Sequence, residues 1–324
     1  MKVLSYFTLI FTLTLIVVLM LAGCGQATTP ESTPTPLSES TFTPLPTSDF
    51  PLTLTDDIGR EITIDTKPER VVSLLPSNTE ILFAVGAGEQ VVGVTSYCNY
   101  PEEATTREQV GGITTKSLNV ETIVALEPDL VLASGSQSDI IPILEESGLT
   151  VVVLEPATFD DIFANIELVG QVTGHTDEAT ALTGELRQRV DTVTATVSAA
   201  DAQPTVFYEV WHDPLMTGGP NTFIGQLITL AGGQSIFADV EEDWPQVSTE
   251  VVVERNPAVI LGPDSHADEL TAEKINARAG WESVAAVQNG EIYMLNGDAV
   301  SRPGPRIVDM LEEAARDLHP DLFE

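Results

Sequence analysis

The chain has 324 residues, enough for one large domain or two ordinary ones with a buried core. Aspartate and glutamate outnumber lysine and arginine by 49 to 14, and the formal net charge is −35. This excess of acid argues against a nucleic-acid-binding protein, which needs a basic face, and against a domain that lies on anionic lipid. The two cysteines, Cys24 and Cys98, are too few for a disulfide framework or a four-cysteine zinc site.

Residues 1–23 have the pattern of an export signal, in which Lys2 precedes a mostly apolar run and then small residues. The run ends in Leu21-Ala22-Gly23-Cys24, which resembles the bacterial lipoprotein box, whose cysteine becomes the acylated first residue. We therefore expect a lipid on Cys24 that holds the protein on the outer face of the cell membrane, with no other membrane contact. The alternative is an uncleaved membrane anchor, because about 20 apolar residues can span a bilayer.

Residues 24–50 are expected to form a flexible tether. Of the 22 residues from Ala27 to Ser48, 16 are Thr, Ser or Pro, and such a stretch has too little apolar surface to offset the entropy lost on ordering. A coil of this length has a root-mean-square reach of roughly 25–30 Å. It would let a folded part, residues 51–324 with a net charge of −33, stand away from a membrane.

The folded part alternates short β-branched runs with helical stretches, which indicates parallel sheets covered by helices on both faces. The elements expected in the first half are strands Val71–Leu75, Val91–Val94, Leu130–Ala133 and Val151–Leu154 and helices Asn78–Val85, Val120–Leu126 and Ile140–Glu146. Those expected in the second half are strands Val206–Val210, Val259–Leu261 and Ile292–Leu295 and helices near 222–231, 249–255 and 305–318.

The two halves resemble each other at a constant offset of 129 residues. The matching residues are Glu121, Pro128, Val131 and Leu132 in the first half and Glu250, Pro257, Ile260 and Leu261 in the second. A second correspondence joins Asn78-Thr79 to Asn221-Thr222, pairs of good N-cap residues that each precede an apolar helix. We predict an α/β fold of two similar Rossmann-like lobes, residues 51–158 and 201–324, with parallel-rich central sheets and a ligand cleft between the lobes.

Residues 159–200 are expected to link the lobes as a helical region broken near Gly174-His175. The second helix opens at Thr176 and continues to about Ala199, so it spans roughly 35 Å at 1.5 Å per residue. A long rigid helix between lobes predicts that they open and close only to a limited extent.

Enzyme motifs are missing from the sequence, since Gly86-x-Gly88 lacks a third glycine and follows a helix, and no His or Cys spacing resembles a catalytic or zinc site. We predict no catalytic residue, no cofactor and no metal site. His212 follows a strand, where α/β lobes contact ligands, and is a weak candidate for contact with a ligand's metal. We expect His175 and His319 to be solvated and Cys98 to be a small buried hydrophobe.

The segment Val71–Gly93, VVSLLPSNTEILFAVGAGEQVVG, resembles the N-terminal signature of the periplasmic binding proteins for vitamin B12, haem and ferric siderophores, the helical-backbone class of ABC-importer binding proteins. The similarity continues through Thr95–Pro101 and Trp244–Glu250 to Asp298 and Arg302–Arg306, and is greatest to the cobalamin-binding branch. The resemblance implies an extracytoplasmic monomer that carries a small molecule to an ABC importer permease dimer.

The resemblance also implies which residues line the cleft. A corrin is broad, partly apolar and fringed with amides, so aromatic planes and a few hydrogen-bonding groups suit it. Tyr97 and Trp244 are expected against the corrin, with simple core packing as the alternative for each, and Trp211 is a weaker additional candidate. The expected ligand-binding residues are Pro76, Asn78, Tyr97, Trp211, Met216, Trp244 and Asp298.

Glu121 and Glu250 resemble the family's docking carboxylates, one on each lobe, which meet arginines on the permease. Charge-assisted pairs of this kind give register as well as attraction, and the negative net charge would speed the encounter with a basic permease surface. The alternative role for each glutamate is to interact with the dipole at its helix N-terminus.

A corrinoid is the ligand that these residues favour. Ferric catecholates call for bases in the cleft, yet Lys116 is the only base between Glu108 and Leu186. Haem requires bases for its propionates and a His or Tyr ligand, for which Tyr97 and His212 are candidates. Thr115-Lys116 is polar where some cobalamin binders have an aromatic residue. A metal-ion-binding or adhesion lipoprotein is the alternative from another class.

Overall fold

The computed structural model describes residues 50–264 and 270–323. The expected signal peptide, Cys24 and nearly all of the expected tether lie outside the described residues. Phe50, which we assigned to the tether, packs against the hydrophobic core instead. Among the described residues, no helix has both the length and the apolar character needed to cross a membrane.

The first lobe is built on a five-stranded sheet in which every pairing is parallel. Residues of β6 alternate between two hydrophobic clusters, with Leu130 and Leu132 on one side and Val131 and Ala133 on the other. The sheet is therefore buried on both faces, as its near-continuous apolar strands predicted. Its order is β5 (Glu108–Gln109), β4 (Val91–Val94), β3 (Val71–Ser73), β6 (Leu130–Ala133) and β7 (Val151–Val153).

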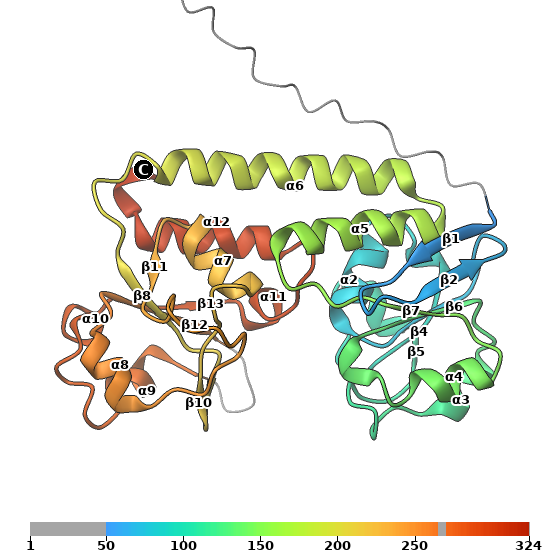
Figure 1. The fold of residues 1–324 in the computed structure, drawn as a ribbon, viewed down its shortest axis with the longest axis horizontal. Coiled ribbons are helices and arrows are strands. Elements are labelled where there is room, and N and C mark those ends of the chain that lie inside the picture. The colour runs from blue at the N-terminus through green and yellow to red at the C-terminus, as the bar shows by residue number, and fades with distance from the viewer. Residues whose placement is uncertain (1–49, 265–269, 324) are drawn as a thin grey trace, which may run out of the picture. The chain divides into compact units, whose positions relative to one another are not determined.

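Helices and a separate hairpin complete this lobe (Figure 1). The hairpin consists of β1 (Leu52–Thr55) and β2 (Glu61–Ile64), paired antiparallel. The helices are α2 (Pro76–Ala84), α3 (Val120–Ala125) and α4 (Ile141–Glu146), with short 3₁₀ turns η1 (Gly88–Gln90), η2 (Glu102–Thr106) and η3 (Gly135–Gln137).

The second lobe is built on a four-stranded parallel sheet. Its order is β11 (Gln234–Ser235), β8 (Thr205–Tyr208), β12 (Val259–Pro263) and β13 (Ile292–Leu295). A two-stranded hairpin, β9 (Trp211–His212) and β10 (Leu215–Met216), follows β8. The helices are α7 (Phe223–Leu230), α8 (Thr249–Arg255), α9 (Ala272–Asn276), α10 (Ala285–Asn289), α11 (Gly297–Val300) and α12 (Ile307–Leu318), followed by the 3₁₀ turn η4 (Pro320–Leu322).

The predicted repeat is confirmed at the level of the backbone. The order β4-β3-β6-β7 in the first sheet matches β11-β8-β12-β13 in the second, and β6 and β12 begin 129 residues apart. Glu127 and Asn256, also 129 apart, follow α3 and α8 with φ of 46° and 45°. A left-handed residue followed by proline ends both helices in the same way.

The second predicted correspondence is wrong in its first member. Thr222 caps α7 by accepting a hydrogen bond from the Gly225 amide, but α2 begins at Pro76, with Leu75 at the N-cap. Proline suits the first position of a helix because its φ is already helical and its missing N–H would have no partner there. Asn78 therefore lies inside the helix, not at its cap.

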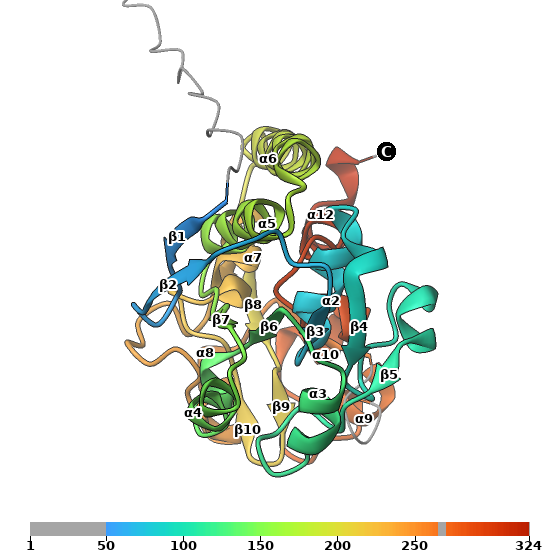
Figure 2. The same cartoon turned by 90° about the vertical axis from the view of Figure 1, so that its right-hand side faces the viewer.

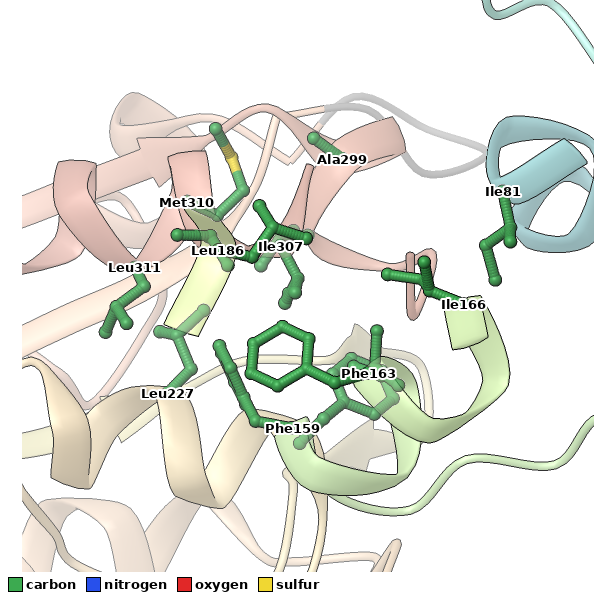
Figure 3. Packing of buried hydrophobic residues seen from close by; sticks show 14 of the residues in the cluster. Ile81, Phe159, Phe163, Ile166, Leu186, Leu227, Ala299, Ile307, Met310 and Leu311 are labelled. Carbon is green, nitrogen blue, oxygen red and sulfur yellow. The ribbon is translucent and has the colours of Figure 1, made fainter. Parts of the chain in front are cut away.

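Two helices, α5 (Phe159–Thr173) and α6 (Thr176–Val197), lie between the lobes in sequence and break at Gly174, where φ is 73°. Helix α6 packs along α5 and along α12, and α5 in turn packs against α2 of the first lobe (Figures 1 and 2). One cluster of buried residues runs from the first sheet through α5 and α6 to α7 and α12. Phe159 and Phe163 of α5 lie beside Leu227, Ile307 and Leu311 within it (Figure 3).

The expectation that His175 and His319 are solvated is wrong for His319 and only partly right for His175. His175 is half-buried. His319 is buried, with its Nε2 atom 3.1 Å from the carbonyl oxygen of Gly232. A Cβ atom at Gly232 would come within 2.6 Å of this nitrogen, so the glycine is what lets the ring approach. Cys98 is buried, as expected.

Candidate functional site

A cavity of about 530 Å³ is lined by residues of both lobes. Most of them follow the carboxyl ends of parallel strands, the edge where α/β folds bind ligands. From the first lobe come Leu75, Pro76, Ser77, Tyr97, Ser134 and Glu155, and from the second come Phe223, Asp243, Trp244, Gly297, Asp298 and Arg302. We call this space the interlobe cavity.

Tyr97 and Trp244 present large aromatic surfaces to the interlobe cavity, one from each lobe. Tyr97 is 56% exposed and Trp244 is 43% exposed, which excludes simple core packing for both rings. The Trp244 ring also packs at 61° against Phe223, with centroids 5.7 Å apart. A smaller apolar hollow of about 310 Å³ lies on the second lobe and shares Phe223 and Trp244 with the interlobe cavity.

Two further expected residues, Pro76 and Asp298, also line the interlobe cavity. Asn78 does not, because the earlier start of α2 turns it into the interior, where it is 2% exposed. Its Nδ2 atom donates to the carbonyl oxygen of Ala133 at 3.2 Å. Asn78 thus holds the helix to the end of β6 rather than facing the space between the lobes.

Trp211 and Met216 lie opposite each other in the β9–β10 hairpin, outside the set of residues that line the interlobe cavity. The Trp211 ring stacks on His212, with centroids 5.6 Å apart, and its Nε1 atom donates to the carbonyl oxygen of Asp213. His212 lines a separate hollow with Leu270 and other residues of that lobe. Within residues 50–264 and 270–323, no group of three or more His, Cys, Asp or Glu side chains is placed to hold a metal ion.

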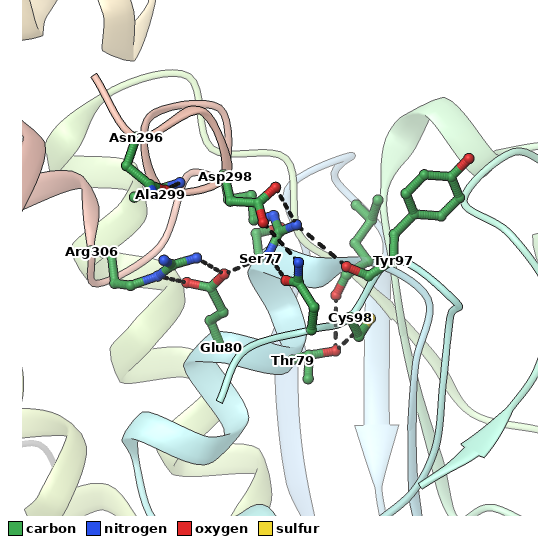
Figure 4. Close-up of polar contacts among 12 residues, drawn as sticks. Ser77, Thr79, Glu80, Tyr97, Cys98, Asn296, Asp298, Ala299 and Arg306 are labelled. Carbon is green, nitrogen blue, oxygen red and sulfur yellow. Dashed lines mark hydrogen bonds and ion pairs between the residues drawn. The ribbon is translucent and has the colours of Figure 1, made fainter. Parts of the chain in front are cut away.

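A buried carboxylate that no sequence pattern predicted joins the two lobes through hydrogen bonds (Figure 4). Glu80 of α2 is 3% exposed and accepts hydrogen bonds from Arg306 at 2.8 and 2.5 Å and from Arg302 at 3.1 Å. Burial lowers the pKa of Arg306, but the hydrogen bonds to Glu80 and the negative charges around the guanidinium together outweigh this effect, so the pKa is raised. The sequence signal for this contact is an acid inside the apolar run of α2. The arginines that pair with it lie more than 220 residues away, so no local pattern identifies them.

Arg302 extends this contact toward the interlobe cavity. Its Nη1 atom donates to Asn99 Oδ1 at 2.6 Å, and its Nη2 atom donates to Asp298 Oδ1 at 2.7 Å and to the carbonyl oxygen of Tyr97 at 3.3 Å. Asn99 in turn donates to Asp298 Oδ2 at 2.7 Å. We call Glu80, Asn99, Asp298, Arg302 and Arg306 the interlobe network.

Glu121 and Glu250 occupy equivalent positions on the two lobes. Each is exposed and is the second residue of its helix, after an N-cap residue, Asn119 or Ser248, whose side chain accepts an amide hydrogen bond. The carboxylate of Glu250 accepts from its own backbone amide and from the Ser248 side chain, which lowers its pKa. Neither glutamate lines the interlobe cavity.

Comparison with known proteins identifies the protein family to which this two-lobed chain belongs. A family model described as periplasmic binding protein matches residues 71–299. The chain belongs to the periplasmic binding protein family. It is therefore an extracytoplasmic binding component of an ABC importer and not an enzyme.

Several members of the family are similar over most of their length. An uncharacterized ABC transporter substrate-binding lipoprotein of Bacillus subtilis, YvrC, is 34% identical over 80% of this chain and 82% of its own. A cobalamin-binding protein of Halobacterium salinarum is 34% identical over 78% and 70%. The crystal structure of the vitamin B12-binding protein BtuF of Vibrio cholerae aligns with a TM-score of 0.67 at 29% identity, covering 80% of this chain and 99% of that one.

Proposed function

We propose that this periplasmic binding protein captures a corrinoid in the interlobe cavity and delivers it to the permease of an ABC importer. The observation that carries the proposal is the pair of exposed aromatic rings, Tyr97 and Trp244, which line one cavity from opposite lobes. Two such surfaces suit a broad, partly apolar macrocycle. The relatives named for cobalamin and vitamin B12 support the same ligand class.

The charge of the interlobe cavity favours this ligand over haem and ferric catecholates. Both of these are anionic and call for bases, whereas Arg302 is the only base among the described residues that line the cavity. Its guanidinium already donates to Glu80 and Asp298. Tyr97 could serve as an axial haem ligand, but His212 lines a different hollow.

Titration with hydroxocobalamin tests the ligand. We expect a protein-dependent change in the corrinoid absorption spectrum and a rise in melting temperature, with affinity at least about tenfold weaker in Tyr97→Ala and in Trp244→Ala. Trp211→Phe is the matched control, because this tryptophan lies outside the cavity lining. The corrinoid proposal would be wrong if the spectrum and the melting temperature stayed unchanged while haemin or a ferric catecholate bound. The ligand would then be the anionic compound that binds.

The remaining parts of the proposal concern placement on the cell. A lipid on Cys24 would anchor the protein to the outer face of the membrane, and Glu121 and Glu250 would dock it, as a monomer, on the permease dimer. The equivalent exposed positions of the two glutamates support docking, because each lobe then presents one carboxylate that can pair with an arginine of the permease. The corrinoid is cargo, and no resident cofactor is proposed.

A further inference from the structure

Four charged residues line the interlobe cavity among the residues that the structure describes: Glu155, Asp243, Asp298 and Arg302. Of these, Arg302 and Asp298 are hydrogen-bonded to each other and to other members of the interlobe network. The network as a whole holds two carboxylates, Glu80 and Asp298, and two guanidinium groups, Arg302 and Arg306. Its charges therefore balance, and it leaves no cation for a ligand.

Glu155 is the carboxylate that the first lobe contributes outside this network. It follows β7 closely, it is exposed, and its Oε2 atom accepts a hydrogen bond from the Gly135 amide at 2.6 Å. Its own amide donates to Asp57 Oδ2 at 2.6 Å. A Cβ atom at Gly135 would lie 3.0 Å from Glu155 Oε2, so this position is held by a close backbone contact. The carboxylate is thus fixed at the cavity wall.

Asp243 is the corresponding carboxylate of the second lobe. It directly precedes Trp244, it is exposed, and its carbonyl oxygen accepts a hydrogen bond from the Gly219 amide at 2.7 Å. The ion pairs formed by the described residues include neither Asp243 nor Glu155. The interlobe cavity therefore carries two carboxylates that no base of the described chain neutralises by direct pairing.

Carboxylates distinguish an amide from an acid on a ligand. An ionised carboxylate only accepts hydrogen bonds, so it can pair with the NH₂ group of an amide but not with another carboxylate, which it also repels. The N-terminus of α2 attracts a ligand carboxylate instead of repelling it, because Pro76 and Ser77 line the cavity at the positive end of that helix. That end is equivalent to about half an elementary charge, which is less than either carboxylate alone.

We propose that Glu155 and Asp243 determine the charge specificity of the interlobe cavity: it accepts a corrinoid whose fringe consists of amides and discriminates against one in which an amide is replaced by a carboxylate. This inference rests on the proposed function. At a separation of about 7 Å, with partial screening by water and salt, repulsion between unit charges gives roughly tenfold discrimination.

The test compares two ligands that differ only in this charge. Cyanocobalamin is titrated calorimetrically against each of its derivatives in which one side-chain amide has been hydrolysed to the acid, at low and at high salt. We expect the protein to bind cyanocobalamin about tenfold more tightly than the monoacids, with a smaller ratio at high salt. In the double variant Glu155→Gln, Asp243→Asn the ratio should fall to within about twofold.

Glu146→Gln and Glu254→Gln are the matched controls. They remove one exposed carboxylate from each lobe at positions outside the cavity lining, and they should leave the ratio unchanged. Equal binding of cyanocobalamin and the monoacids by the unmodified protein overturns the charge specificity alone. So does an undiminished ratio in the double variant, provided that it still binds cyanocobalamin. If no corrinoid binds the unmodified protein, the proposed function fails and the specificity falls with it.

Discussion

At the scale of single residues, Glu80 is a side chain whose loss should lower the stability of the protein. Its carboxylate is buried and paired with two arginines from the other lobe. Glu80→Gln removes the negative charge, takes the carboxylate partner from Arg306 and leaves Arg302 with the carboxylate of Asp298 alone, so we expect the free energy of unfolding to fall by about 3 kcal/mol. Urea denaturation measures this change.

Glu89→Gln provides the control, because Glu89 is an exposed acid of the same lobe and its replacement should change stability by less than about 0.5 kcal/mol. A loss below about 1 kcal/mol in Glu80→Gln would show that the interlobe network contributes little to stability.

Asp317 in α12 gives the protein an unusual pH dependence. Burial, together with the neighbouring charge of Glu313, raises its pKa to about 6. The folded state therefore holds this proton more tightly than the unfolded state does, and the free energy of unfolding falls as pH rises from about 4 to about 6. Asp317→Asn should remove this penalty and stabilise the protein by about 1 kcal/mol at pH 7.5, a value reduced for partial exposure.

Thermal unfolding of Asp317→Asn at pH 7.5 and at pH 4 separates this effect from a general one. We expect little change at pH 4, where the aspartate is already protonated in the folded state. Asp321→Asn, a change at an exposed aspartate nearby, is the control. Equal stabilisation at both pH values would mean that the charge of Asp317 is not the cause.

Some residues of the site could be predicted from the sequence and others could not. Tyr97 and Trp244 could be assigned to the cavity because each lies in a segment that carries the family resemblance. The pair formed by Glu80 and Arg306 spans 226 residues, and no local pattern reports such a contact. Asn78 was misplaced because a proline at the first position of a helix outweighed the preference of asparagine for the N-cap.

At the scale of elements, signals confined to one element were the most reliable. The 129-residue offset was visible because a glutamate, a proline and two apolar strand residues recur at the same spacing in and after α3 and α8. The strands β5, β9, β10 and β11 were missed because each has two residues, too few for a periodic pattern. The β1–β2 hairpin was missed although its strands are longer, and its partly buried residues pack against the core.

The equivalence of α3 and α8 predicts how the protein meets its permease. Charge reversal at Glu121→Arg together with Glu250→Arg should abolish corrinoid uptake by cells while leaving the affinity for the ligand within about twofold, because neither residue lines the interlobe cavity. Placing a cation at each helix N-terminus should cost about 0.3–1 kcal/mol per site. Uptake assays and calorimetry with the same variants measure the two effects.

Glu146→Arg together with Asp321→Arg is the control for this pair, since it changes the net charge equally at exposed positions of the same lobes that lie outside α3 and α8. Full uptake by the Glu121→Arg, Glu250→Arg variant would contradict the docking role. Equal loss in both double variants would attribute the effect to net charge.

At the scale of the whole folded part, the continuous core through α5 and α6 limits how the lobes can move. Opening the interlobe cavity widely would separate buried surfaces that α6 shares with α5 and α12. Arg189 of α6 also pairs with Asp309 and Glu312 of α12 at 2.6 and 2.9 Å. Such a linkage differs from a hinge of flexible strands, which changes shape without exposing a core.

We therefore expect the separation of the lobes to change by less than about 2 Å when the corrinoid binds. Spin labels on cysteines introduced at Glu146 and Glu254, with Cys98→Ser to remove the buried thiol, report this separation by pulsed electron paramagnetic resonance. One narrow distance distribution should appear with and without ligand. A shift of about 10 Å, or two resolved populations, would show that the lobes separate despite the buried core that α5 and α6 share with α7 and α12.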